Sequence, residues 1–140
     1  MWQIYNRPSG RKYGNRKVTT ADGKTFDSAK EANRYCELLI LQRAGEIRDL
    51  ETQKEFELIP AQYETFPRYG KTGKRLKDGK RCIEQAVKYK ADFAYIDNAT
   101  GRLVVEDTKG FRDPASAGFA KYVIKRKLML YVHGIRIKEI

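Results

Sequence analysis

Two apolar segments that contain acidic residues constrain the fold of this chain most. Residues 91–95 read ADFAY and residues 103–110 read LVVEDTKG, and between them the residues 98–101 (NATG) are typical of a turn. The pattern predicts two antiparallel strands joined as a hairpin. Such a hairpin can bring Asp92 beside Asp107. The sequence therefore predicts that two carboxylates meet on one sheet.

The chemistry of these residues indicates a divalent-metal phosphodiesterase site. The carboxylates of Asp92 and Asp107 are hard oxygen ligands of the kind that Mg²⁺ or Mn²⁺ prefers, and the main-chain carbonyl of Thr108 could add another. Because strand side chains alternate between faces, Lys109 points the same way as Asp107. It would hold or activate a water, or offset charge in the transition state. The alternative is an edge carboxylate at Asp92 and a solvated Asp107–Lys109 pair.

Three further polar residues have two interpretations each. Glu106 has the opposite parity to Asp107 and is expected on the other face of the sheet, but a bulge would exchange their roles. Glu31 follows Ser28 by three residues, so its carboxylate either completes a capping box or serves as a third acidic ligand. Gln53 lies between two predicted strands and is either a polar neighbour of the site or, as favoured, a plain loop glutamine.

Charge and composition restrict the partners and the chemistry. The 140 residues form one domain, with 29 Lys and Arg against 18 Asp and Glu, and the net charge of +11 favours an anionic polymer such as nucleic acid or an acidic membrane. No apolar run is long enough to span a membrane. His133 is the only histidine, which argues against zinc and histidine-triad sites. Cys36 and Cys82 form no metal motif and are expected to be reduced, partly buried thiols of a cytoplasmic protein.

Basic residues gather in three segments. Residues 1–17 are expected to form an arm or irregular edge, and residues 62–81 a loop or loose hairpin in which aromatic residues alternate with basic ones. Two lysines one turn apart share a face of the second helix. The alternatives are a basic loop without a dedicated role and a solvated helix face. The nucleic-acid-binding candidates are Arg11, Lys12, Arg16, Lys17, Lys71, Lys74, Arg75, Lys121 and Lys125.

Periodicity and capping signals predict an α/β fold with a mixed central sheet flanked by helices. The order is a helix, three strands, a helix and a strand, preceded by a small hairpin with an Asp-Gly turn. The expected elements are a hairpin at 17–26, a helix from 28 to Gly45, strand-like segments at 47–51 and 55–59, strands at 82–95 and 102–108, a helix that starts after Asp113-Pro114 and stops at Gly134, and a strand at 135–140.

The order of these motifs resembles the PD-(D/E)XK nuclease superfamily. The corresponding pieces are Glu31 on the first helix, Asp92 before a phenylalanine, the Asp-Thr-Lys of residues 107–109, and Lys121 and Lys125 on the later helix. The superfamily core is αβββαβ, which matches the predicted order over about residues 26–140. The segments FDSAKEA, LETQ, YKADF and VEDTKG also look like those of small phage-encoded endonucleases. Some relatives in the superfamily are Holliday junction resolvases.

The resemblance implies Mg²⁺- or Mn²⁺-dependent cleavage of DNA phosphodiester bonds, often by a homodimer. The chain departs from the pattern at Ala91, where the superfamily has proline, and in the Glu106-Asp107 doublet. We expect branched DNA as substrate, because the chain lacks a separate sequence-reading module. We expect a twofold dimer, because cutting two strands needs two sites. The alternatives are a non-catalytic nucleic-acid-binding protein, or a nicking, restriction-like or RNA-directed nuclease.

Overall fold

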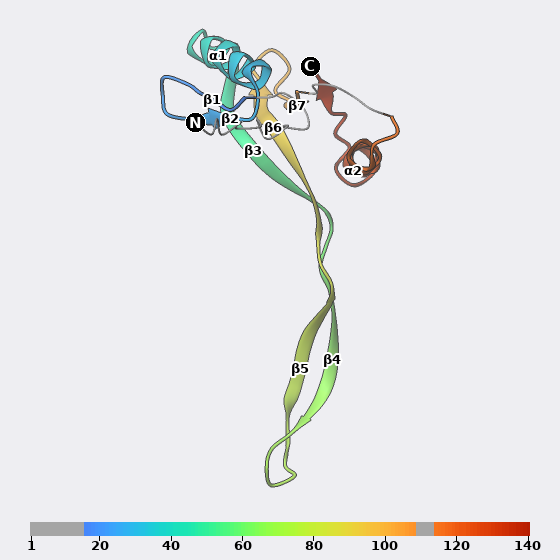
Figure 1. Cartoon of the computed structure of the whole chain (residues 1–140). Coiled ribbons are helices and arrows are strands. Elements are labelled where there is room, and N and C mark those ends of the chain that lie inside the picture. Colours follow the sequence, from blue (N-terminus) through green and yellow to red (C-terminus); the bar gives the residue numbers. More distant parts are fainter. Residues whose placement is uncertain (1–15, 109–113) are drawn as a thin grey trace, which may run out of the picture.

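The computed structural model describes residues 16–108 and 114–140. A four-stranded sheet in the order β3-β6-β7-β8 forms the body of the molecule, and a two-stranded hairpin, β4-β5, extends from it (Figure 1). The elements are β1 Val18–Thr19, β2 Thr25–Phe26, α1 Ala29–Arg43, β3 Ile47–Ile59, β4 Gln62–Tyr69, β5 Arg75–Glu84, β6 Val87–Asp97, β7 Leu103–Asp107, α2 Ala117–His133 and β8 Lys138–Glu139.

The sheet is mixed. Strands β3, β6 and β7 are antiparallel neighbours, and β8 pairs in parallel with β7. The predicted α/β class, with a mixed sheet and two helices, is confirmed. Outside the hairpins β1–β2 and β4–β5, the elements follow in the order α1, β3, β6, β7, α2, β8.

Capping residues set the ends of both helices. The Ser28 hydroxyl accepts a hydrogen bond from the Glu31 amide at 3.2 Å and so caps α1. Gly134 ends α2 in the left-handed conformation, with φ of 68°, as predicted. Helix α2 starts after Asp113-Pro114 as predicted, but at Ala117. Its N-cap is Ser116, which accepts from the Phe119 amide at 3.1 Å, and not Asp113, so Pro114 is not in its first turn.

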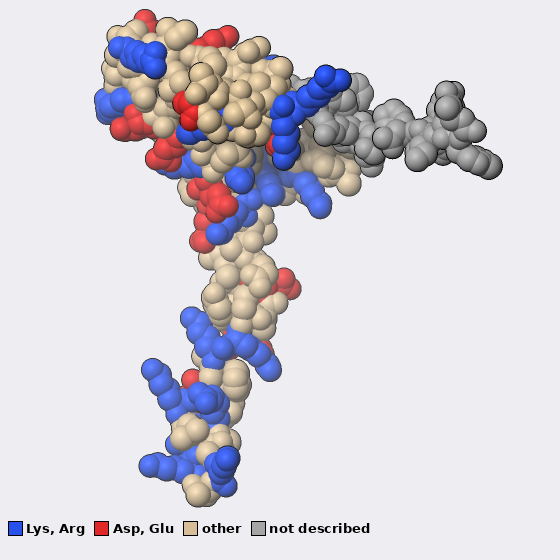
Figure 2. All heavy atoms as spheres, turned by 60° about the vertical axis from the view of Figure 1, so that its left-hand side comes forward, with Lys and Arg blue, Asp and Glu red and all other residues tan. Residues whose placement is uncertain are grey.

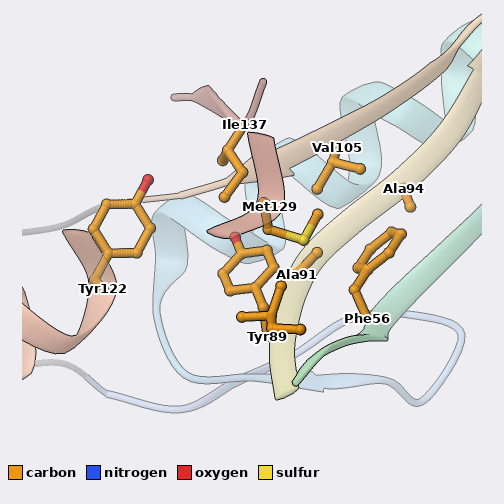
Figure 3. Packing of buried hydrophobic residues seen from close by; sticks show 9 residues of the cluster. Phe56, Tyr89, Ala91, Ala94, Val105, Tyr122, Met129 and Ile137 are labelled. Carbon is orange, nitrogen blue, oxygen red and sulfur yellow. The ribbon is translucent and has the colours of Figure 1, made fainter. Parts of the chain in front are cut away.

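Two apolar clusters cover the sheet, one on each face. The first lies between the sheet, α2 and the segment before β8, and contains Tyr89, Val105 and the fully buried Met129 (Figure 3). The second lies between the sheet, α1 and the β1–β2 hairpin, and contains Leu38 and Phe93, both fully buried. The body therefore has a helix on each face and buries β6 on both sides.

Several expected strands have other boundaries. The two expected at 47–51 and 55–59 are one strand, β3, whose pairing with β6 continues on both sides of Gln53. The strand expected at 82–95 is two strands, β5 and β6. The last strand is only Lys138–Glu139, shorter than the 135–140 expected from its alternation.

The basic segment at 62–81 was predicted to be a loop or a loose hairpin, and it is a hairpin. Strands β4 and β5 pair only with each other among the described strands, and Figure 1 shows them extending away from the body. From here on, the arm means residues 62–84 and not the N-terminal segment 1–17.

Both cysteines are free and exposed, so the expectation of partly buried thiols is wrong. Cys36 lies on the outer side of α1, and Cys82 lies in the arm, where little of the chain covers it. No helix in the described parts of the chain is long and apolar enough to cross a membrane.

Candidate functional site

Asp92 and Asp107 lie opposite each other at the end of the β6–β7 pairing. Phe93 pairs with Glu106, so the next position in the same register places Asp92 across from Asp107. Asp92 Oδ2 accepts hydrogen bonds from Thr108, at 2.7 Å from the amide and 2.8 Å from the hydroxyl. The expectation that the hairpin brings the two carboxylates together is confirmed.

Regular strand geometry is interrupted at Asp92. Ala91 belongs to the cluster under α2 and Phe93 to the cluster under α1, although residues two apart on a regular strand share a face. Gln53 lies opposite Asp92 in the β3–β6 register and has a positive φ of 55°, which a non-glycine residue adopts at a cost. Such strained positions are concentrated at functional sites. The local irregularity turns the strand at the position of the acid.

Glu31 completes an acidic group from a different element. Its side chain is buried, 6% exposed, and its Oε1 accepts a hydrogen bond from Nε2 of Gln53 at 3.0 Å. Burial, followed by the negative charges of Asp92 and Asp27, raises the pKa of the Glu31 carboxyl from 4.5 to about 7. Gln53, expected in a loop, is therefore a strand residue that contacts a site carboxylate.

These residues line one pocket of about 570 Å³ between the N-terminal end of α1, the β6–β7 pair and α2. Its acidic lining includes Glu31, Asp92 and Asp107, and its basic lining includes Lys121 and Lys125 on α2. The structure thus brings six of the sequence-selected residues to one place, since Thr108 also lines the pocket. The lining therefore combines carboxylates from the sheet and α1 with lysines from α2.

Glu106 is on the other face of the sheet, as its parity predicts. Its carboxylate is fully buried and accepts from Arg34 at 2.6 and 2.8 Å and from the Tyr95 hydroxyl at 2.6 Å. Hydrogen bonds and charge from Arg34, with the Tyr95 hydrogen bond, hold the pKa of Glu106 below its ordinary value despite burial. The alternative that Glu106 replaces Asp107 in the pocket is therefore wrong, because Glu106 is fixed in an ion pair with α1.

Two tyrosines were missed in the sequence. The Tyr89 hydroxyl donates to Asp107 Oδ2 at 2.5 Å, and Tyr122 lines the pocket and donates to Glu139 at 2.6 Å. Burial raises the pKa of both phenols. In sequence both belong to apolar stripes, and only the place of Tyr89 within YKADF and of Tyr122 beside Lys121 could have indicated a role.

The remaining candidates are distributed along the chain. Arg16 and Lys17 are exposed near β1, and Lys71, Lys74 and Arg75 are exposed at the end of the arm. Lys109, Arg11 and Lys12 lie outside the described residues. Among the described residues, the basic candidates at 16–17 and in the arm lie outside the pocket, whereas Lys121 and Lys125 line it.

The donor set fits a hard divalent cation. Within residues 16–108 and 114–140, no three acidic, histidine or cysteine side chains form a ready-made metal cage. Mg²⁺ is commonly held by one or two carboxylates, waters and substrate phosphates rather than by an all-protein cage. Two opposed aspartates in an open pocket, with Glu31 nearby, supply ligands of this type.

One family model matches the chain. It is described as "Protein of unknown function (DUF1064)" and covers residues 10–135, which include the whole pocket and the arm. Neither the search of curated proteins nor the search of solved structures found a match.

Proposed function

This chain belongs to the DUF1064 family, and we propose that it is a Mg²⁺- or Mn²⁺-dependent DNA endonuclease related to the PD-(D/E)XK superfamily. The observation that carries the proposal is the pocket, in which Asp92 and Asp107 lie opposite each other with Glu31 and two lysines around them. The αβββαβ order of the body supports the same proposal. Paired acids on a sheet and cations on a helix suit a phosphodiester substrate.

Asp92, Asp107 and the main-chain carbonyl of Thr108 would hold the cation, with Glu31 in support. A bound divalent cation supplies a water of lowered pKa and polarises a phosphate oxygen. Tyr89 orients Asp107 through its 2.5 Å hydrogen bond, and Gln53 orients Glu31. These second contacts limit the rotamers of the carboxylates, as is usual around metal sites.

The lysines provide the contacts to the substrate. Lys121 and Lys125 lie one turn apart on α2 and both line the pocket, so they are placed to bind a phosphate that enters it. Lys109 follows Asp107 by two residues, and we propose that it holds the hydrolytic water or offsets charge in the transition state.

We further propose branched DNA as the preferred substrate and a twofold homodimer as the active form. A single chain presents one such pocket among its described residues, and paired cuts on two strands need two pockets. Sedimentation of the protein with junction DNA tests the dimer. A monomer bound to DNA contradicts paired cutting.

A substrate panel tests the activity. Cruciform, flap, single-stranded and linear duplex DNA are incubated with Mg²⁺ or Mn²⁺ and wild-type protein, Asp92→Asn, or the pair Asp107→Ala/Lys109→Ala. We expect wild type to cut and both variants to fail. Asp92→Asn should still bind DNA, because loss of a carboxylate lessens repulsion from phosphate. Asp97→Asn is the matched control, since Asp97 lies on β6 outside the pocket and should cut normally.

The same panel distinguishes the proposed nuclease from a protein that only binds nucleic acid. A non-catalytic nucleic-acid-binding protein, in which the acids only balance charge, would bind without metal and cut none of the substrates. Equal cleavage by the Asp107→Ala/Lys109→Ala variant would also refute the proposed site. A preference for linear duplex, for single nicks or for RNA would agree with the proposed catalytic site and would contradict only branched DNA as the substrate.

A further inference from the structure

We propose that the arm binds a DNA duplex beyond the cleavage pocket, so that the protein needs a duplex of about 13 base pairs or more next to the cut for full affinity. This inference rests on the proposed DNA substrate. It concerns residues 62–84, which do not line the pocket.

The arm carries a surplus of positive charge. Residues 62–84 contain seven Lys and Arg against three Asp and Glu, which gives a net charge of +4. Figure 2 shows that the lysines and arginines gather over the end of the arm farthest from the body. Two copies of this surface would repel each other, whereas a phosphate backbone complements it. Nucleic acid is therefore the partner that the charge favours.

The base of the arm adjoins the pocket. Tyr89 and Lys90 line the pocket, and β6 begins two residues before Tyr89, where the arm joins it. Lys90 pairs with Glu55 of β3, and Tyr69 at the end of β4 follows fourteen residues later. At about 3.3 Å per strand residue the arm reaches at most about 45 Å from this point. That distance corresponds to about 13 base pairs of duplex.

A cation–π contact holds Arg81 on the arm, and Gly79 leaves room for Phe66 and Arg68. Phe66 lies across Gly79 on the opposite strand, and a Cβ at Gly79 would stand 2.6 Å from Phe66 Cε2 and 2.8 Å from Arg68 Cδ. The Arg81 guanidinium lies 5.3 Å from the centre of the Phe66 ring and pairs with Glu64. Only glycine at position 79 allows this packing.

Two of the three aromatic rings of the arm are engaged within it, which favours duplex over single-stranded DNA. Phe66 is engaged by Gly79 and Arg81, and Lys80 covers Tyr63 with its Nζ 4.3 Å from the ring centre. Bases of a single strand bind by stacking on uncovered rings. Tyr69 is the most exposed of the three rings, so the arm offers its cations and mainly this single ring. A two-stranded ribbon is an element that fits the major groove.

Binding measured on duplexes of two lengths tests the inference. Fluorescence anisotropy with labelled duplexes of about 10 and about 30 base pairs, in EDTA so that nothing is cut, compares wild type with Lys71→Gln/Lys74→Gln. On the long duplex the slope of log affinity against log salt should fall by about 1.8 in the variant, because two phosphate contacts are lost. From 50 to 200 mM salt, wild type should then lose about 12-fold more affinity than the variant. On the short duplex the two proteins should match.

Two glycine variants provide a matched comparison. Gly79→Ala should weaken binding to the long duplex several-fold, because it displaces Phe66 and Arg68. Gly70→Ala, whose added Cβ would come no nearer than 3.7 Å to its neighbours, should not. Equal affinity of wild type and the lysine variant on the long duplex, an equal loss on both lengths, or tighter binding of single strands than duplex each overturns the inference. Circular dichroism confirms that each variant is folded.

These outcomes are distinguishable from failure of the proposed nuclease. A wild-type protein that cuts nothing but binds long duplex through the arm refutes only the nuclease. A protein whose cleavage depends on Asp92 but whose binding ignores Lys71 and Lys74 refutes only the role of the arm.

Discussion

Replacing Glu31 with glutamine is expected to stabilise the metal-free protein above neutral pH and to impair cleavage. Glu31 is buried beside Asp92, and its pKa rises from 4.5 to about 7. Between these values the folded state binds more protons than the unfolded state, so the free energy of unfolding falls as the pH rises through this window. Above about pH 7 Glu31 is ionised in the folded protein, and its buried charge lowers the free energy of unfolding by the full amount.

The magnitude follows from the pKa values. A change of one in pKa corresponds to about 1.4 kcal/mol, so the rise from 4.5 to about 7 amounts to at most about 3 kcal/mol. Glutamine carries no charge and its carbonyl can still accept the hydrogen bond from Gln53. Glu31→Gln should therefore gain up to about 3 kcal/mol over wild type at pH 8 and little at pH 4.

Urea unfolding in EDTA between pH 4 and 8 measures the effect. With a slope of about 2 kcal/mol per molar urea, the midpoint of the variant should exceed that of wild type by up to about 1.5 M at pH 8. Glu46→Gln, at an exposed position just after α1, is the matched control and should follow wild type. Saturating Mg²⁺ should stabilise wild type more than Glu31→Gln, because binding to the folded state adds stability. A variant less stable than wild type at pH 8, or a difference that does not depend on pH, would refute the reasoning.

Two further substitutions test other parts of the site. Glu106→Gln should lower the free energy of unfolding by about 3 kcal/mol, because it leaves Arg34 without its buried charge partner. The folded protein should still cut DNA. Loss of cleavage by the fully folded variant would show that Glu106 acts in the reaction. Gln53→Gly should relieve the positive φ, worth up to about 1 kcal/mol, and still reduce cleavage through loss of the Glu31 contact. The matched control is Asp49→Gly, which relieves a φ of 56° on the same strand but outside the pocket. This variant should gain stability and cleave normally. Equal cleavage by both glycine variants would exclude a positioning role for Gln53.

The local features of the fold followed from the sequence. The caps and stops at Ser28, Gly45 and Gly134 act through residues adjacent in the chain, so short motifs identify them. The Asn-Ala-Thr-Gly turn fixes the register of β6 and β7, and that register alone places Asp92 across from Asp107. The α/β class, the opposed aspartates and the placement of Glu106 on the opposite face from Asp107 were therefore predictable.

Only the tertiary structure decided the rest of the site. The sequence left Glu31 between a cap and a ligand, because nothing local shows that α1 packs its first turn over β3 and β6, where Gln53 and Asp92 meet it. The sequence also placed Gln53 in a loop. A strand continues through a residue with a positive φ only because it pairs with β6 on both sides of that residue, and short motifs do not show this pairing.

The partner of Glu106 and the shape of the arm have the same origin. Arg34 is 72 residues from Glu106 in sequence, and their ion pair exists only because α1 crosses that face of the sheet. The arm was a basic segment of undecided form until pairing of β4 with β5, with Phe66 over Gly79, made it a ribbon. The sequence by itself determined which acids and bases this protein has and, for Glu106 and Asp107, which strand faces they occupy. Packing between distant segments determined which of them meet, because burial and ion pairing act between atoms that the chain order does not bring together.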